Sequence, residues 1–162
     1  MVELNSFSNI DPDVNLELGT QRCEYYTLNE YNNLILDTEQ NFKLLNFNVR
    51  SFHSNHDSFA ALLDTLPSLP EAVVLTETWN TAENLSMCTL ENYDGNHTYR
   101  ITGRGGGVSV FCHSAGTCNK IPTMCLCSEN IETCAVECVY QEFQLIVLGV
   151  YRPPAGSPED FV

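Results

Sequence analysis

Apolar positions between residues 42 and 80 predict a strand, a helix and a second strand. The stretch FKLLNFNV, residues 42–49, has the length and apolar content of a strand. In DSFAALLDTL, residues 57–66, apolar side chains recur at helical spacing, and Asp57 or Ser58 is available as the N-cap. Residues 72–76, AVVLT, form the second strand after two prolines. This order favours neighbouring parallel strands joined by a crossover, so both strands should end at one edge of the sheet.

The second half of the chain has an antiparallel pattern. We expect a loop around residues 92–96 and a strand from Val108 to Phe111, directly after three consecutive glycines. Two further strands, residues 133–139 and 143–151, are joined by the short sequence YQE, which suggests a hairpin. The triple glycine opens a strand and not a helix, so neither the P-loop nor the dinucleotide fingerprint applies. It indicates instead that two backbones approach closely.

Composition and charge add a division of the chain. The 162 residues and 43% hydrophobic content fit one globular domain. The net charge is −14, and residues 1–40 contribute half of it, with eight acids against Arg22 alone. We interpret residues 1–40 as an acidic, partly disordered leader with a possible short helix from Tyr31 to Leu36, and residues 41–162 as the folded domain.

The start of the chain lacks the basic flank and apolar run of a signal peptide, and no apolar stretch reaches the roughly 20 residues of a bilayer-spanning helix. We therefore expect a protein of the nucleus or cytoplasm that is not secreted and has no membrane partner. In that reducing setting the eight cysteines should be thiols. A zinc site is disfavoured, because the cysteines at 125, 127, 134 and 138 lack the usual C-x-x-C pair, and Cys134 and Cys138 fit one face of a strand.

Polar residues follow both early strands at the edge where an open α/β sheet binds ligands. Asn48 and Arg50 end the first strand, and Glu77 ends the second. An unpaired charge in a dry site is costly, so Glu77 must be solvated, paired or bound to a cation. Taken singly, Asn48 could cap a turn and Glu77 could be a solvated loop acid. Taken together, they could form a site.

Four segments in order resemble the endonuclease domain of LINE-type, non-long-terminal-repeat retrotransposons. They are NFNVRSF at 46–52, LTETWN at 75–80, RGGGVSVF at 104–111 and GVYRPP at 149–154. This family belongs to the exonuclease–endonuclease–phosphatase superfamily, together with apurinic endonucleases and deoxyribonuclease I. The resemblance covers residues 42–162. It implies a four-layer α/β sandwich with a mixed sheet, of which this chain holds the N-terminal part.

The resemblance also implies an activity and a site. Family members cleave phosphodiester bonds in DNA with Mg²⁺ or Mn²⁺, and the retrotransposon enzymes nick target DNA to prime reverse transcription. Glu77 matches the metal-binding acid, Asn48 the asparagine that orients the phosphate, and Tyr151 a hydroxyl near the scissile phosphate. Arg50 and Arg152 are expected to bind substrate. DNA is thus the expected partner; no small-molecule cofactor is expected, and the oligomeric state is left open.

Departures from the family pattern limit the expected activity. The later Gly-Asp-x-Asn and Ser-Asp-His segments of the family do not occur before Val162. None of the four histidines belongs to a Ser-Asp-His sequence. We therefore expect the C-terminal half of the sandwich to be missing and the chain alone not to nick DNA. We also expect the strands between residues 108 and 151 to leave either an uncovered apolar face or an unpaired edge. Two alternatives stay open: a non-catalytic protein-interaction domain derived from this fold, and another phosphoesterase of the superfamily.

Overall fold

The computed structural model describes residues 27, 30–31, 42–140, 143–154 and 156. The expected leader therefore lies outside the described residues except at three positions, as does almost all of the helix expected from Tyr31 to Leu36. At those positions the Thr27 backbone amide donates to a Glu30 carboxylate oxygen at 2.7 Å and the Glu30 amide donates to the Thr27 hydroxyl at 3.3 Å, which is a capping box. No helix in the described part of the chain is long and apolar enough to cross a membrane.

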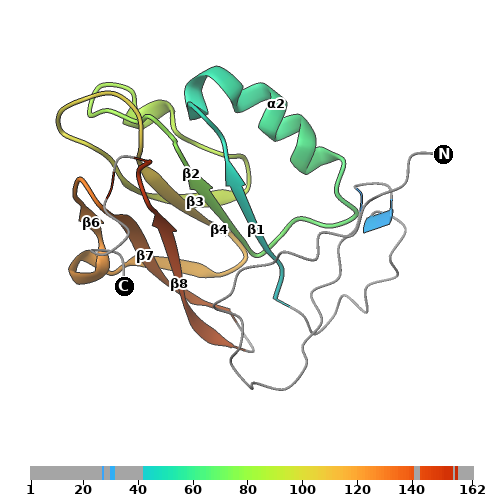
Figure 1. Ribbon diagram of the computed structural model, residues 1–162. Coiled ribbons are helices and arrows are strands. Elements are labelled where there is room, and N and C mark those ends of the chain that lie inside the picture. The colour runs from blue at the N-terminus through green and yellow to red at the C-terminus, as the bar shows by residue number, and fades with distance from the viewer. Residues whose placement is uncertain (1–26, 28–29, 32–41, 141–142, 155, 157–162) are drawn as a thin grey trace, which may run out of the picture. The chain divides into compact units, whose positions relative to one another are not determined.

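Sheet A is a mixed four-stranded sheet with the strand order β1-β2-β4-β3 (Figure 1). Its strands are β1 (Leu44–Asn48), β2 (Ala72–Thr76), β3 (Tyr93–Thr98) and β4 (Val108–His113). β1 and β2 pair in parallel, whereas β4 pairs antiparallel with both β2 and β3. The predicted parallel pair with its helical crossover is confirmed, because α2 connects β1 to β2.

Helix α2 (Phe52–Asp64) begins five residues earlier than the sequence pattern predicts. Its N-cap is Ser51, whose side chain accepts a hydrogen bond from the Ser54 amide at 3.3 Å, so the expected cap at Asp57 or Ser58 is wrong. The side-chain amide of Asn55 also donates, from Nδ2, to the carbonyl of Val49 at 2.9 Å. These polar side chains satisfy the backbone of a first turn that lacks a helical apolar pattern, so the helix starts where the strand ends.

Sheet B is antiparallel throughout and packs against sheet A. It consists of β5 (Thr117–Lys120), β6 (Leu126–Cys127), β7 (Glu132–Val139) and β8 (Gln144–Tyr151), with β7 paired to the other three. The predicted β7–β8 hairpin is confirmed by the pairing, and the Tyr140 amide donates to the Phe143 carbonyl at 2.9 Å. Its turn at residues 141–142 lies outside the described residues. Two short 3₁₀ turns, Leu85–Met87 and Pro122–Met124, lie in connecting loops.

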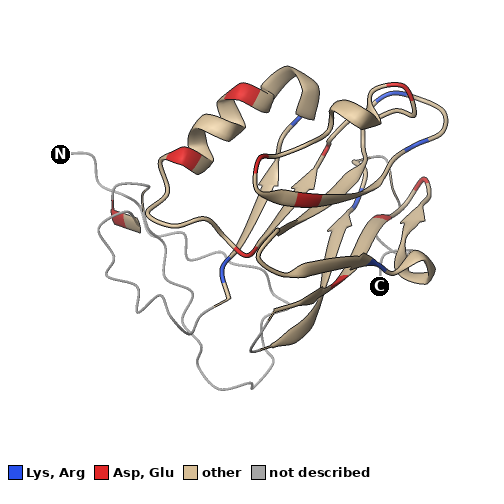
Figure 2. Cartoon of the chain, turned by 180° about the vertical axis from the view of Figure 1, so that it is seen from behind, with Lys and Arg blue, Asp and Glu red and all other residues tan. Residues whose placement is uncertain are grey.

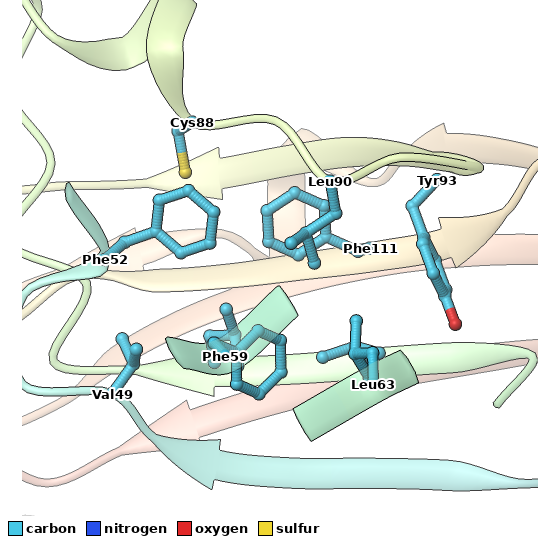
Figure 3. Close-up of a cluster of buried hydrophobic side chains, with 10 residues drawn as sticks. Val49, Phe52, Phe59, Leu63, Cys88, Leu90, Tyr93 and Phe111 are labelled. Atoms are coloured by element: carbon cyan, nitrogen blue, oxygen red, sulfur yellow. The ribbon is translucent and has the colours of Figure 1, made fainter. Parts of the chain in front are cut away.

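Two apolar clusters hold three layers together. Between α2 and sheet A, Phe52 and Phe111 stack with ring centroids 5.8 Å apart (Figure 3). Between the two sheets lies a second cluster of valines and cysteines, including Val74, Val110 and Val136. Because successive side chains of a strand point to opposite faces, β2 supplies Val73 and Leu75 to the first cluster and Ala72 and Val74 to the second. The expected α/β sandwich with a mixed sheet is confirmed.

The outer face of sheet B carries exposed apolar side chains. Ile146, Leu148 and Val150 alternate along β8 with exposed fractions of 57%, 45% and 40%. No helix covers this face within the residues that the structure describes. An uncovered apolar face was one of the two outcomes expected from the sequence, and this is where it lies.

The loop expected around residues 92–96 is instead part of the edge strand β3. Its sequence, YDGNHT, lacks the apolar alternation of a strand, so the pattern gave no sign of it. Backbone pairing with β4 decides the conformation, and Gly95 makes room for the Phe111 ring, since a Cβ there would lie 2.8 Å from Phe111 Cε1. β5 was not predicted either, for the same reason: its four residues, TCNK, are largely polar.

Candidate functional site

Glu77 lies directly beyond the end of β2, and its half-buried carboxylate is held by its neighbour Trp79 and by two other segments. Oε2 accepts hydrogen bonds from the Trp79 indole Nε1 at 2.5 Å and from the Gly106 amide at 3.2 Å. Oε1 accepts a hydrogen bond from the hydroxyl of Tyr151 at the end of β8. We refer to the loop that contains Gly105, Gly106 and Gly107 as the glycine loop. The carboxylate is therefore fixed where sheet A, sheet B and the glycine loop meet, and it retains access to solvent.

Backbone strain is concentrated at the edge of sheet A where β1 and β2 end, which we call the rim. Five described residues other than glycine have positive φ, and four of them are at the ends of β1 and β2: Arg50, Ser51, Glu77 and Trp79. A left-handed conformation costs about 1–2 kcal/mol for such residues. Hydrogen bonds between the two strand ends hold it in place, including Ser51 N to Glu77 O at 2.7 Å. Clustered strain that the surrounding structure maintains is typical of functional sites.

The triple glycine packs its backbone against the segment that carries Glu77. The Gly106 carbonyl accepts from the Trp79 amide at 2.9 Å, and the Gly107 carbonyl accepts from the Thr78 amide at 3.3 Å. Both glycines have positive φ, and a Cβ on Gly106 would lie 2.5 Å from Glu132 Oε1. The predicted close approach of two backbones is confirmed, and it places the glycine amides beside Glu77.

A second carboxylate, Glu132, anchors the glycine loop from sheet B. Its side chain is completely buried, and it accepts hydrogen bonds from Arg100 Nε and from the Gly107 amide. Sequence reasoning did not select Glu132 or Arg100. The available signal was an acid that opens the otherwise apolar strand ETCAVECV, because a charge is buried only when it is paired.

Asn48 and Arg50 reach the same rim from β1. Asn48 pairs with Thr76, the residue before Glu77, and this register puts it on the face of sheet A from which Val74 contacts sheet B. Its side chain is exposed, as is that of Arg50. The site thus brings an amide and a carboxylate to adjacent strand ends.

Tyr151 and Arg152 reach the site from β8. Tyr151 is half-buried, pairs with Glu132 across sheet B and donates its hydroxyl to Glu77. Arg152 follows it, is exposed, and donates from Nη1 to the Gly156 carbonyl at 3.1 Å. Of the residues selected from the sequence, the structure joins Glu77 and Tyr151 directly, and it brings the segments that carry the other three to the same rim.

Positive charge collects around this rim although the chain is strongly acidic. Each of the four arginines in the described residues belongs to a segment that contacts Glu77 or Glu132. Figure 2 draws Lys and Arg alike in blue and shows blue in the loop at the upper right. Arg104 lies over the Trp79 ring, with 5.2 Å between Cζ and the ring centroid. The sequence gave only the overall charge; the fold decides where the cations are.

A depression of about 630 Å³ borders the site. Its walls come from the loop before the glycines, from the end of β6 and the segment after it, and from the residues that follow β8: Tyr99, Arg100, Ile101, Thr102, Cys127, Ser128, Glu129, Asn130 and Pro153. Ile101 is 96% exposed in this loop. The depression is therefore partly apolar and partly charged, and Arg100 and Pro153 connect it to the segments around Glu77.

The donors at the rim suit a hard divalent cation. Mg²⁺ binds through one or two carboxylates and completes its shell with waters and phosphate oxygens. Oε1 of Glu77 accepts a single hydrogen bond, from Tyr151, so this oxygen keeps a lone pair for a cation. Asn48 offers an amide oxygen on the neighbouring strand. Glu132 is excluded as a ligand because its oxygens are buried and paired with Arg100 and Gly107.

Comparisons with known proteins support the fold. The chain is similar to the AP endonuclease LMAP from Leishmania major, with 14% sequence identity, a TM-score of 0.51, and coverage of 74% of this chain and 43% of that chain. The APE2 catalytic domain of Xenopus laevis has 19% identity, a TM-score of 0.48, and coverage of 72% and 46%. The 3′ phosphatase NExo from Neisseria, bound to product DNA hairpin, has 14% identity, a TM-score of 0.45, and coverage of 65% and 40%.

The chain spans less than half the length of these three structures. No protein-family model matches it, and a search of curated proteins found no match. The similarity to LMAP is thus one of fold. The described part of the chain has an α/β fold similar to that of an AP endonuclease.

Proposed function

We propose that this chain carries part of the active site of a metal-dependent phosphodiesterase that acts on DNA. The observation that carries the proposal is the Glu77 carboxylate, held at a strained strand end by Trp79, Gly106 and Tyr151. A structural acid does not require this strain, since a simple loop would solvate it. The strain and the three donors fix the carboxylate in one orientation, as a metal ligand requires.

Each residue of the site has a role in this proposal. Glu77 holds the cation through Oε1, which accepts one hydrogen bond, and Asn48 binds the cation or a phosphate oxygen beside it. The Tyr151 hydroxyl donates to Glu77 and so orients its carboxylate. By the resemblance of GVYRPP, we assign this hydroxyl a place near the scissile phosphate. A bound divalent cation would stabilise negative charge on the phosphate that is attacked. Arg50, Arg104 and Arg152 are available to bind the flanking phosphates.

We further propose that the parent protein is a retrotransposon endonuclease that nicks its target DNA. Support for this origin comes from the four sequence segments NFNVRSF, LTETWN, RGGGVSVF and GVYRPP in their order along the chain. We also propose that this chain alone does not turn over, because the segment expected to supply the general base does not occur within it. Loss of a general base typically slows a reaction by about 10²–10⁴-fold. Metal binding, and not nicking, is therefore the first test.

The single tryptophan makes that test direct, because Trp79 contacts Glu77. Titration with Mn²⁺, a paramagnetic quencher, should reduce Trp79 fluorescence in a saturable way. Glu77→Gln should abolish the saturable component, whereas Glu91→Gln, an exposed acid elsewhere, should leave it unchanged. Equal quenching in the parent chain and in Glu77→Gln would overturn the proposed metal role.

DNA binding is tested with charge-matched variants. Arg104→Ala and Lys43→Ala each remove one positive charge, but Lys43 lies at the opposite end of β1 from Arg50 and bonds Ser68. We expect Arg104→Ala to weaken binding of a DNA duplex and to lower the salt dependence by about one unit of slope, as loss of one phosphate contact does. Lys43→Ala should do neither. Equal effects of the two substitutions would show attraction without a defined site.

A protein-interaction role is the second candidate, favoured by the exposed apolar row Ile146, Leu148 and Val150 on β8. Such rows often mark binding surfaces. The two functions make different predictions for the Mn²⁺ titration. An interaction domain without a metal site predicts no difference between the parent chain and Glu77→Gln.

A further inference from the structure

Three cysteine sulfurs converge between the two sheets, away from the rim that carries Glu77. Cys112 belongs to β4 of sheet A, and Cys118 and Cys138 are directly opposite each other on β5 and β7 of sheet B. The Sγ of Cys112 lies 2.7 Å from that of Cys138 and 2.7 Å from that of Cys118. We refer to these three residues as the thiol cluster.

The spacing of the thiol cluster is not that of ordinary packing. A disulfide bond is about 2.05 Å long, and unbonded heavy atoms as small as carbon stay about 3.5 Å apart. Pairs at 2.7 Å lie between these limits, and all three cysteines are free thiols. Cys134 points to the same side of β7 as Cys138, but its Sγ donates to the Asn96 carbonyl at 3.4 Å and interacts with only one other thiol, that of Cys125. Among the residues that the structure describes, three sulfurs converge only in the thiol cluster.

We propose that the thiol cluster binds a soft, thiophilic metal ion of low coordination number, with Cu⁺ as the best match. Thiolate sulfur selects ions of this kind. The three ligand atoms already lie within 4.8 Å of one another. An ion about 2.3 Å from each sulfur needs sulfurs roughly 3.8–4.0 Å apart, so each close pair opens by about 1 Å.

The ligand count argues against a structural zinc ion. Zn²⁺ in such sites is almost always bound by four ligands. Among the residues that the structure describes, no fourth cysteine, histidine or acid completes this group. The polar neighbour is Asn96, whose Nδ2 donates to Cys118 Sγ at 3.1 Å and would stabilise negative charge on that sulfur. Three sulfurs suffice for a monovalent soft ion.

The surroundings allow entry and retention. Cys112 and Cys138 are buried at 1% and 0% exposure, whereas Cys118 on β5 is half-buried and provides the access route. An ion bound here would be shielded from water and would join sheet A to sheet B through sulfur ligands from both. Binding should therefore stabilise the fold as well as fill the site.

The test is a Cu⁺ titration of the full chain under reducing conditions, in competition with a chromophoric Cu⁺ chelator. We expect one tightly bound ion per chain and a rise in Tm. Cys118→Ala should weaken Cu⁺ binding by more than the roughly 10–100-fold that loss of a group outside the ligand set costs. Cys127→Ala removes an exposed cysteine outside the cluster and should leave the affinity unchanged.

The outcomes separate the possibilities. Equal affinity of the parent chain and Cys118→Ala, or equal loss in both variants, would overturn the proposal, because binding would not depend on the cluster. So would a disulfide between Cys112 and Cys138, seen as loss of two hydrogens by mass spectrometry in the reduced preparation. If Cys118→Ala fails to fold, X-ray absorption of the Cu⁺-loaded parent chain decides: three sulfur neighbours support the site, and any other ligand set refutes it.

Discussion

Removing Arg100 should destabilise the fold more than removing the charge of its partner Glu132. The two side chains form a buried ion pair between the loop before the glycines and β7, with side-chain exposures of 28% for Arg100 and 0% for Glu132. Arg100→Met keeps much of the apolar stem but leaves the Glu132 carboxylate with only the Gly107 amide as a partner. Glu132→Gln keeps a neutral acceptor of nearly the same shape.

The difference in burial between Arg100 and Glu132 sets the loss in free energy of unfolding that we expect for each substitution. Leaving a buried charge without its partner costs about 3–5 kcal/mol. In Glu132→Gln the unpaired charge is that of Arg100, which is partly exposed and can be hydrated. We therefore expect a loss of about 1.5–3 kcal/mol, the contribution of a charge-assisted hydrogen bond. The double variant should lose less than the sum of the two single variants, because the charge that Arg100 neutralises is gone.

Urea unfolding followed by far-UV circular dichroism gives the free energy of unfolding for each variant. Lys120→Met is the control: it removes a cation whose Nζ donates to the His97 carbonyl on the surface, and it should cost less than about 1 kcal/mol. If Arg100→Met costs no more than Glu132→Gln, the burial of the Glu132 charge is not what holds the glycine loop, and the reasoning fails.

Three other outcomes follow from the geometry. Gly107→Ala should destabilise the chain by about 2–4 kcal/mol in urea unfolding, because φ at Gly107 is positive and a Cβ would lie 2.5 Å from Thr78 Oγ1. Gly103 has a similar φ but open space around it, so Gly103→Ala should cost only about 1–2 kcal/mol. Equal costs for the two substitutions would contradict the steric argument. Phe111→Ala should cost about 3–5 kcal/mol, since the ring is fully buried against Phe52, while the exposed Phe47→Ala should cost clearly less, and similar losses for both would contradict the packing of this core. Burial, with a smaller contribution from Lys120, lowers the pKa of His97 from 6.5 to about 4. Between these pH values the unfolded chain binds a proton that the folded chain does not, so the free energy of unfolding should fall as the pH drops from about 6.5 to 4. If the urea midpoint falls as steeply with pH in His97→Gln, His97 is excluded as the cause.

The sequence by itself determined the first half of sheet A. β1, β2 and α2 from Asp57 onward have apolar patterns over consecutive residues, and their order favours a parallel pair with a crossover. The same local signal marked Glu77, because a charge that directly follows AVVLT must lie where the buried strand ends. Local patterns of this kind depend only on neighbours in sequence, so they can be interpreted without a structure.

Tertiary structure alone decided the partners. The hydrogen bond from Tyr151 to Glu77 spans 74 positions, and that from Arg100 to Glu132 spans 32. The polar strand β3 exists because β4 offers it a backbone partner, and the thiol cluster exists because two sheets place separate cysteines face to face. No pattern along the chain encodes such encounters: they depend on how the sheets pack and on which side chains that packing brings together.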